Sequence, residues 1–374
     1  MKTINMAEPF FTYEEKERVK QEVSKILDNS LSMGPNVIEF QREFSKKMKI
    51  NHSIAMNSCT SALEAAIQYF DVSGKEVIVP CQSFIATAMA VILSGGKPVF
   101  AEIKKETMCL DMEDIKKKIN SNTKGIIVVH MAGNISPDLY DLYNFCKCNN
   151  LFLIEDAAHT PGSKLIDKYA GTIGDVGCFS FYPSKIITCG EGGMLTTSND
   201  EIAKFAKSYQ NRGRDMSVDE EIYTNPGRNV RMTEISAFLG RIQLANLDKY
   251  LENRRRIASI YINALNDHDE IFLVAPKNLH QSSFWKFPII LNDRFNRDKI
   301  LMELNNKGIK ADAAYKPPLH LQPVIKRILN INDNHLPFSE KILRQHICLP
   351  CHQRMSNDDA NYVVDTLLET LVNI

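Results

Sequence analysis

One lysine stands among apolar residues, where a charged side chain needs a reason. Lys185 lies in CFSFYPSKIITCGEGGM, residues 178–194, a pattern typical of a buried strand followed by a loop and a glycine-rich turn. Burying an ammonium group is costly. A lysine whose pKa is lowered by its surroundings can form a Schiff base with a carbonyl compound. The alternative is a surface lysine that keeps its ammonium in water, as most lysines do.

Two acidic residues end an apolar, strand-like segment. Glu155 and Asp156 follow Leu-Phe-Leu-Ile, residues 151–154, and His159 comes three residues later. Open α/β sheets bind their ligands at the carboxyl ends of the strands. A carboxylate at that point could serve a metal, a ribose or a protonated pyridine nitrogen. Asp156 could equally cap the next helix.

A polar turn opens directly into a predicted helix near residue 60. The segment MNSCTSALEAAI, residues 56–67, brings Thr60 and Ser61 to the helix start. Helix N-termini offer free backbone N–H groups and a positive dipole end, which suit a phosphate. Taken alone, the segment is explained more simply as a helix cap with Glu64 as the partner residue.

A second polar turn precedes a long predicted helix. The segment NPGRNVRMTEISA, residues 225–237, contains Asn229 and Arg231, with Thr233 or Glu234 available as caps. A loop followed by a helix start is the alternative interpretation.

The order of these features is more specific than any one of them. A helix start suited to phosphate comes first, then Asp156 after a strand, then Lys185 after another strand. Pyridoxal phosphate needs a phosphate cradle, a carboxylate that keeps its ring nitrogen protonated, and a lysine for the imine. This order is the one expected for that cofactor in an aminotransferase-type fold.

Composition excludes several other classes of protein. Among 374 residues, 45 Lys and Arg balance 45 Asp and Glu, so the chain has no basic field for a nucleic-acid backbone. Its start lacks the apolar core of a signal peptide, and no apolar run is long enough to span a bilayer. We expect a cytoplasmic protein with no nucleic-acid or membrane partner.

The nine cysteines form one suggestive cluster. Cys348-Leu-Pro-Cys351-His352 matches the C-x-x-C-H signature of covalent haem attachment, and His346 lies nearby. Against haem or another metal stand the missing export signal, the proline inside the motif and the lack of a second ligand pair. We expect reduced thiols and no metal.

The first two-thirds of the chain alternates short apolar runs with amphipathic stretches. Strands are predicted at 76–80, 98–103, 125–130, 151–155, 177–181 and 193–197, with helices at 60–70 and 138–150. This regular alternation favours an α/β layer architecture around a mostly parallel sheet.

The pattern changes near residue 232. One or two long helices are predicted over 232–265, then apolar runs at 272–276 and 284–291, a helix near 296–307, and proline-rich loops at 316–323 and 347–352. We expect a large α/β domain over residues 1–245, N-terminal segment included, and a small α+β domain over 246–374.

The chain resembles the sugar aminotransferases of the DegT/DnrJ/EryC1/StrS group, which are fold-type I pyridoxal-phosphate enzymes with the aspartate-aminotransferase-like fold. The resemblance covers nearly the whole chain and keeps the order of the motifs. It is carried by NSCTSALEAA, EVIVPCQSFIATAMAVILSGGKPVFAEI, IEDAAHTPGS, CFSFYPSK, GRNVRM, KPPLHLQP and LPCHQRMS.

The resemblance implies roles for particular residues around pyridoxal 5′-phosphate. Lys185 would form the internal aldimine and then shuttle a proton between the cofactor C4′ and the substrate carbon. Asp156 would pair with the pyridine nitrogen. The other implied cofactor contacts are Phe84 on the ring face, His159 near the ring hydroxyl, and Thr60, Ser61 and Ser180 at the phosphate.

The resemblance also implies a second subunit and a substrate side. Asn229 would reach the phosphate bound by the neighbouring subunit, so the active unit would be a homodimer. Tyr315, His320 and Arg231 would lie near the substrate. Two positions depart from the family pattern: Cys59 stands where the phosphate turn usually has glycine, and Arg228 stands where tyrosine usually precedes Asn229.

The implied activity is amino transfer, with L-glutamate as the expected donor and a keto group of a nucleotide-linked deoxysugar as the acceptor, in amino-deoxysugar biosynthesis. Lys185 argues for transamination, since the related sugar 3-dehydratases carry histidine at this position. The alternatives are an aminotransferase for a keto-cyclitol or another ring ketone, and a pyridoxal-phosphate-binding regulator without turnover.

Overall fold

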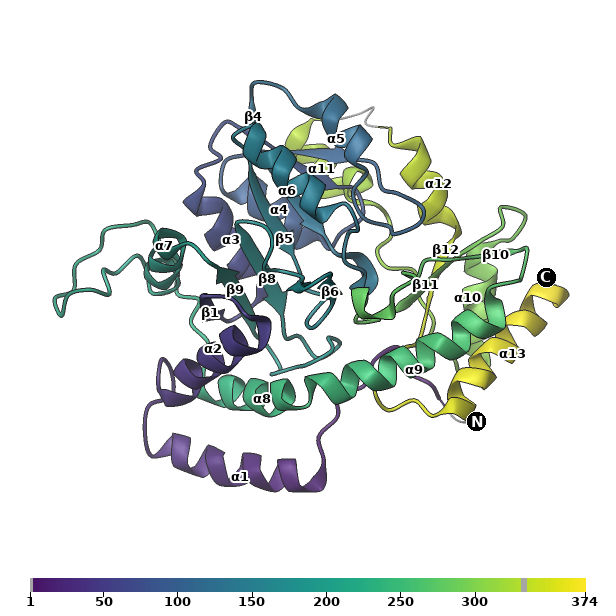
Figure 1. Cartoon of the computed structure of the whole chain (residues 1–374), viewed down its shortest axis with the longest axis horizontal. Coiled ribbons are helices and arrows are strands. Elements are labelled where there is room, and N and C mark those ends of the chain that lie inside the picture. Colours follow the sequence, from purple (N-terminus) through teal and green to yellow (C-terminus); the bar gives the residue numbers. More distant parts are fainter. Residues whose placement is uncertain (1–2, 331–334) are drawn as a thin grey trace.

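A seven-stranded mixed sheet forms the centre of the computed structural model, which describes residues 3–330 and 335–374. The strand order is β1-β9-β8-β5-β4-β2-β3 (Figure 1). The five strands from β8 to β3 pair in parallel, whereas β9 is antiparallel to both β8 and β1. The predicted mostly parallel sheet is confirmed. Its strands are β1 His52–Met56, β2 Glu76–Pro80, β3 Lys97–Ala101, β4 Thr123–Val129, β5 Phe152–Asp156, β8 Val176–Ser180 and β9 Gly193–Thr197.

All six predicted strands of this region are present, and β1 is an addition that the sequence did not reveal. Its residues His52–Met56 begin with two polar side chains and show no clear alternation, yet four of the five are buried. The segment is held by pairing with β9 over its whole length. Its strand character therefore comes from a partner about 140 residues away, as the register His52 to Thr197 shows.

Helices cover both faces of the sheet. On one face of the sheet, a hydrophobic core joins strand residues such as Ile154 to α3, α4 and α7. On the opposite face, a second cluster joins strand residues such as Leu153 to α5 and α6. Phe179 and Phe181 at the end of β8 pack with α2. The alternation of Leu153 and Ile154 between faces is the period of two expected of a strand buried on both sides. The helices are α2 Pro35–Met48, α3 Cys59–Tyr69, α4 Ile85–Leu93, α5 Met112–Lys118, α6 Leu139–Cys148 and α7 Asp200–Gln210.

Two helices connect this sheet to the C-terminal part of the chain. α8 Glu234–Ala245 and α9 Leu247–Leu265 run one after the other across the lower part of the view in Figure 1, and Asn246 separates them. α9 leads to an antiparallel sheet of order β10-β11-β12. That sheet shares a second core with α10 and α13. The elements are β10 Ile271–Leu273, β11 Phe287–Leu291, β12 His346–Leu349, α10 Arg297–Asn306 and α13 Asn357–Asn373.

The small α+β part of the fold is confirmed, with one correction. The predicted proline-rich loop at 347–352 is wrong for its first three residues, because Ile347, Cys348 and Leu349 belong to β12. Pro350, directly after the strand, made the segment resemble a loop. The pairing of Phe287 with Leu349 buries this strand in the second core.

The domain boundary at 245/246 stays a prediction, and chain segments cross it in both directions. Ile4 lies in the second core and is bonded to the backbone of Gly308 and Lys310. In the other direction, Leu319 and Ile325 pack in the core of the large sheet. The C-terminal segment that does so comprises the 3₁₀ turn Leu319–Leu321, α11 Pro323–Leu329 and α12 Pro337–Gln345.

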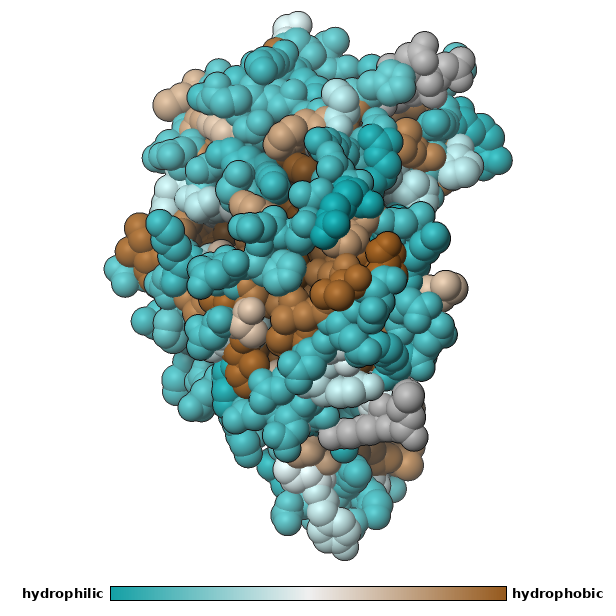
Figure 2. All heavy atoms as spheres, turned by 90° about the vertical axis from the view of Figure 1, so that its right-hand side faces the viewer, coloured by the Kyte–Doolittle hydropathy of each residue, from teal (hydrophilic) through white to brown (hydrophobic). Residues whose placement is uncertain are grey.

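Several further elements complete the described fold. α1 Tyr13–Leu27 lies below α8 in Figure 1, and a short hairpin pairs β6 Lys164–Leu165 with β7 Lys168–Tyr169. Two more 3₁₀ turns span Met131–Gly133 and Leu279–Gln281. Figure 2 shows one largely hydrophilic face that a band of hydrophobic residues crosses. Within residues 3–330 and 335–374, no helix combines the length and apolar character that a membrane span requires.

Candidate active site

A cavity of about 540 Å³ opens at the carboxyl ends of β4, β5 and β8. The start of α3, the residues before α4 and the loop after β8 form its walls, and the segment before β11 closes one side. Seven predicted site residues line this one cavity although they lie far apart in the sequence: Thr60, Phe84, Asp156, His159, Ser180, Lys185 and Tyr315. The strand ends of the sheet therefore gather most of the predicted chemistry.

Lys185 stands in the loop that follows β8. Its backbone N–H donates to the carbonyl oxygen of Tyr182 at 2.9 Å, in a turn that returns the chain toward β8. Its Nζ lies 4.3 Å from the ring centre of Trp285. Burial lowers the pKa of Lys185 to about 8, although Asp156 and Cys59 act in the opposite direction. A neutral amine is therefore more accessible here than on an ordinary surface lysine.

Asp156 is buried at the end of β5. Its Oδ2 accepts a hydrogen bond from the Thr87 hydroxyl at 2.8 Å, and its Oδ1 accepts one from the Ala158 N–H at 3.2 Å. Burial raises the pKa of this carboxyl, and the bond from Thr87 partly offsets that shift. Asp156 closes a local turn and caps no α-helix, since residues 157–163 are irregular. A buried carboxylate of this kind suits a cationic ring nitrogen.

Glu155 faces away from the cavity, because neighbouring strand residues point to opposite sides of a sheet. Its carboxylate pairs with His130 at 2.8 Å. It also accepts from the backbone N–H groups of Gly171, Ile173 and Gly174 at 2.6–2.7 Å. The two adjacent acidic residues therefore have different roles. Glu155 orders the loop at residues 171–174, and Asp156 lines the cavity.

Three rings stand together beside Lys185. His159 stacks on Trp285 with ring centres 3.8 Å apart and planes 13° from parallel, and its Nε2 lies 3.0 Å from the Tyr315 hydroxyl. Burial, with nearby cations, lowers the pKa of His159 well below its ordinary value, so the ring is neutral. Its buried Nδ1 has no protein partner among the described residues. A ligand atom in the cavity could complete that bond.

The start of α3 approaches β9 very closely. A Cβ added to Gly193 would lie 2.2 Å from the backbone carbon of Ser58 and 2.4 Å from the nitrogen of Cys59, so only glycine allows this contact. Ser58 caps α3 by accepting from the Ser61 N–H at 3.1 Å. Cys59 is the first helical residue, so it keeps right-handed geometry and its N–H remains usable.

Four predicted site residues do not line the cavity of this chain. The Ser61 hydroxyl donates to Asn57 Oδ1 at 2.7 Å, below the helix start. Asn229 is exposed in the segment between α7 and α8, and the Arg231 side chain bonds to Asn211. His320 is buried with its Nε2 3.3 Å from Glu340 Oε1. Their roles at the cofactor or the substrate stay predictions.

Neither departure from the family pattern blocks the cavity. Cys59 lines it as part of α3. Arg228 Nε lies 3.4 Å from Glu64 Oε2 in the same chain, so Glu64 binds the loop rather than closing a capping box with Ser58.

Sequence reasoning missed Thr87, Trp285 and Lys286. Thr87 lies inside the apolar pattern of α4, where its hydroxyl carried no visible signal. Trp285 is the only tryptophan of the chain, and Lys286 follows it within an apolar run. The available signal was the position of Lys286 among apolar residues, because a buried ammonium group is costly and therefore indicates a function, as it does for Lys185.

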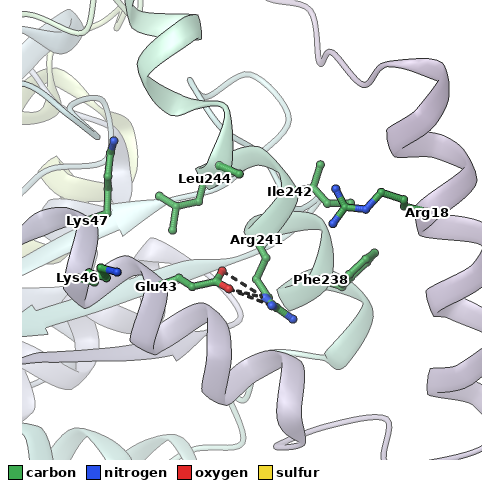
Figure 3. Close-up of a pocket in the computed structure, with 9 residues that line it drawn as sticks. Arg18, Glu43, Lys46, Lys47, Phe238, Arg241, Ile242 and Leu244 are labelled. Carbon is green, nitrogen blue, oxygen red and sulfur yellow. Dashed lines mark hydrogen bonds and ion pairs between the residues drawn. The ribbon is translucent and has the colours of Figure 1, made fainter.

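A second cavity, of about 490 Å³, lies between α1, α2 and α8 (Figure 3). Arg18, Lys46 and Lys47 contribute positive charge, and Arg241 is paired with Glu43 at 2.9 Å. None of the predicted site residues lines this groove. The combination of Lys185 and Asp156 therefore distinguishes the first cavity as the candidate active site.

Lys185 and Asp156 in one cavity at the strand ends of a mostly parallel sheet are the features expected of a pyridoxal-phosphate enzyme. The model of the DegT/DnrJ/EryC1/StrS aminotransferase family matches residues 13–368, and the chain belongs to this family.

Similar proteins extend over the whole chain. GDP-perosamine synthase of Escherichia coli O157:H7 is 30% identical over 373 residues, which cover 99% of both chains. The structure of Helicobacter pylori PseC, an aminotransferase involved in the biosynthesis of pseudoaminic acid, superposes with a TM-score of 0.92. It is 28% identical, with 100% of both chains covered. Spr1654 of Streptococcus pneumoniae, solved in its PLP form, has a TM-score of 0.90 at 26% identity, with 99% of both chains covered.

Pyridoxal 5′-phosphate is the cofactor of this enzyme, and the cavity fits it. Asp156 offers a buried carboxylate for the ring nitrogen, the orphaned Nδ1 of His159 offers a polar contact, and the free N–H groups at the start of α3 suit a phosphate. When bound, the cofactor supplies an electron sink for reactions at the carbon that bears the amino group.

Proposed function

We propose that this enzyme transfers the amino group of L-glutamate to the keto carbon of a nucleotide-linked deoxysugar. L-Glutamate would leave as 2-oxoglutarate and the sugar ketone would become an amine, in the two half-reactions of a ping-pong sequence. The observation that carries the proposal is the presence of Lys185 and Asp156 in one cavity. The acceptor is proposed by analogy with relatives such as GDP-perosamine synthase.

Lys185 has the central role in this proposal. It holds the cofactor between turnovers, and once released it moves a proton to or from the reacting carbon. A pKa of about 8 for the free amine suits the proton transfer, because a base acts best when its pKa lies near the working pH. Asp156 keeps the ring nitrogen protonated, and Phe84 covers the ring.

The remaining residues orient the cofactor and the substrates. We propose that His159 contacts the ring hydroxyl and that Thr60, Ser61 and Ser180 hold the phosphate, Ser61 by ordering the turn. Tyr315 lines the cavity, and we propose that it contacts the substrate. Arg231 and His320 are also proposed to act on the substrate side. They do not line the cavity of this chain, so they would act through neighbouring residues or in the site of an assembled dimer.

We also propose a homodimer whose active sites contain residues of both subunits. The segment between α7 and α8 protrudes from the molecule in Figure 1 and carries Asn229. Met216, Ile222 and Tyr223 of this segment are 47–49% exposed. Exposed apolar side chains on a protruding loop favour a protein partner. Asn229 would then reach the phosphate in the partner's cavity.

Absorbance spectroscopy tests the proposed function. Purified protein loaded with pyridoxal phosphate should absorb in the visible range, and L-glutamate should bleach that band. A nucleotide-linked keto-sugar should then restore it. The Lys185→Ala variant should bind cofactor non-covalently and lose at least about 100-fold in rate. An unchanged wild-type spectrum with every amino donor tried would contradict the proposal.

A further inference from the structure

Lys286 is a second lysine in the wall of the active-site cavity, and the roles proposed so far do not use it. It precedes β11 and is only 7% exposed. Of the described residues that line the cavity, Lys185 and Lys286 are the lysines, and arginine is absent from that wall. Because Lys185 is committed to the cofactor, Lys286 is the cation in this cavity wall that remains for a substrate.

The position of Lys286 is well defined. Its Nζ lies 4.7 Å from the ring centre of Trp285, the same indole that Lys185 contacts at 4.3 Å. The indole is held in turn by a 2.7 Å hydrogen bond from its Nε1 to the carbonyl oxygen of Ser184. One ring therefore sets the positions of both ammonium groups, which brings a fixed positive charge next to the reacting lysine.

Lys286 also borders a second chamber. A cavity of about 430 Å³ lies against the N-terminal residues Asn5, Met6 and Ala7, and Ser184, Trp285 and Lys286 line both this cavity and the active-site cavity. The side chain of Lys286 thus stands in the wall between the cofactor cavity and an adjoining space. That space is where the side-chain carboxylate of an amino-acid donor could extend.

The ion pair with Asp312 leaves N–H donors of the Lys286 ammonium available for a ligand. The ammonium pairs with Asp312, and a lysine ammonium has three N–H donors. Asp312 Oδ1 is buried without a protein partner among the described residues. The Asp312 side chain is otherwise 45% exposed, so the pair is not sealed in the core. A carboxylate that enters the cavity would find a desolvated cation with spare donors.

We infer that Lys286 binds a carboxylate of the amino-acid donor and so determines specificity for the donor half-reaction. The inference rests on the proposed function. A ping-pong aminotransferase must accept an anionic amino acid and a sugar that is uncharged around its keto carbon in the same cavity. With Asp312 as counter-ion, Lys286 forms a neutral pair when the sugar is bound and offers a charged donor when the amino acid is bound.

The test separates the two half-reactions on holoenzyme by stopped-flow absorbance. Lys286→Met should raise the apparent Kd for L-glutamate about 10- to 100-fold, the range for a lost hydrogen bond to a charged group. The limiting rate should change little. The rate and apparent Kd of the half-reaction of the pyridoxamine form with a nucleotide-linked keto-sugar should change by no more than about threefold, since the inference places a carboxylate of the amino-acid donor, and not the diphosphate of the nucleotide, against Lys286. Lys286→Arg should recover part of the affinity for L-glutamate.

Two controls deal with loss of stability. The double variant Lys286→Met with Asp312→Asn removes both charges, so no carboxylate is left unpaired. Lys104→Met breaks another partly buried Lys–Asp pair, with Asp138, and should leave the Kd for L-glutamate unchanged. Calorimetric binding of glutarate, a dicarboxylate without an amine, should be weakened by Lys286→Met, and this readout needs no turnover.

The outcomes distinguish the two proposals. If no amino donor bleaches the wild-type enzyme, the proposed function fails. If wild type is bleached and Lys286→Met responds to L-glutamate with the same concentration dependence, the inference about Lys286 is wrong. Equal weakening of both half-reactions would show that Lys286 does not distinguish the amino-acid donor from the sugar acceptor, and would also overturn the inference.

Discussion

Lys185 and Asp156 owe their chemistry to the same physical cause, which is removal from water. Burial lowers the pKa of the lysine and raises that of the carboxyl, and each charge partly stabilises the other. Compared with the same groups in water, the Lys185 amine loses its proton more readily and the Asp156 carboxylate binds a proton more readily. An acidic partner for the ring nitrogen and a readily deprotonated amine are the two requirements of the cofactor.

The shifted lysine should leave a signature in the stability of the apoprotein. Because the pKa of Lys185 falls from 10.5 to about 8 on folding, the unfolded chain binds more protons than the folded one between these pH values. The free energy of unfolding of wild type should therefore rise with pH across this window, relative to Lys185→Met. Urea unfolding from pH 7.5 to 10 measures the difference. Lys124→Met, which removes an exposed lysine, should follow wild type.

Thr87 positions the Asp156 carboxylate through one hydrogen bond, and this bond favours the ionised form of the carboxylate. Thr87→Val keeps the shape but removes the donor at 2.8 Å, so the dissociation constant for pyridoxamine phosphate should rise about 10-fold. This ligand reports on the ring contact because it has no aldehyde to react with Lys185. Thr370→Val removes a buried hydroxyl that bonds within α13 and should leave the affinity unchanged. Equal affinity for both variants would contradict the role of Thr87.

At the scale of elements, the start of α3 links helix stability to cofactor binding. Ser58 caps this helix and lines the cavity, whereas Ser356 caps α13 far along the chain. Ser58→Ala and Ser356→Ala should each lower the free energy of unfolding by about 1 kcal/mol. Only Ser58→Ala should also weaken binding of pyridoxamine phosphate, because only its helix start lines the proposed phosphate site. Comparable affinity in both variants would argue against a phosphate site at α3.

Elements could be predicted where the local sequence pattern determines their structure, and not where contacts between distant segments determine it. The strands β2, β4, β5, β8 and β9 are apolar runs bounded by turns, and they are visible locally. β1 owes its strand form to β9, and β12 is followed at once by a proline, so neither has a clear local signal. Asp156 and Lys185 could be predicted from their order in the sequence. Trp285 and Lys286 reach the cavity through tertiary packing alone.

At the scale of the whole molecule, the proposed dimer makes a quantitative prediction. If Asn229 serves the partner's cavity, Lys185→Ala and Asn229→Ala subunits are each defective, but a mixed dimer contains one complete site. Random exchange of equal amounts should restore about a quarter of the wild-type activity, since half of the dimers are mixed and each has one intact site. Activity that stays at the level of the separate variants after exchange would place Asn229 outside the partner's site.

The central claim, amino transfer to a sugar, is tested most directly by following the nitrogen atom. The holoenzyme is incubated with L-glutamate labelled with nitrogen-15 and with a panel of nucleotide-linked keto-sugars, and the products are analysed by mass spectrometry. The account predicts that one acceptor gains a labelled amino group as 2-oxoglutarate appears in equal amount. Formation of 2-oxoglutarate with no labelled sugar from any acceptor, or no 2-oxoglutarate at all, would contradict it.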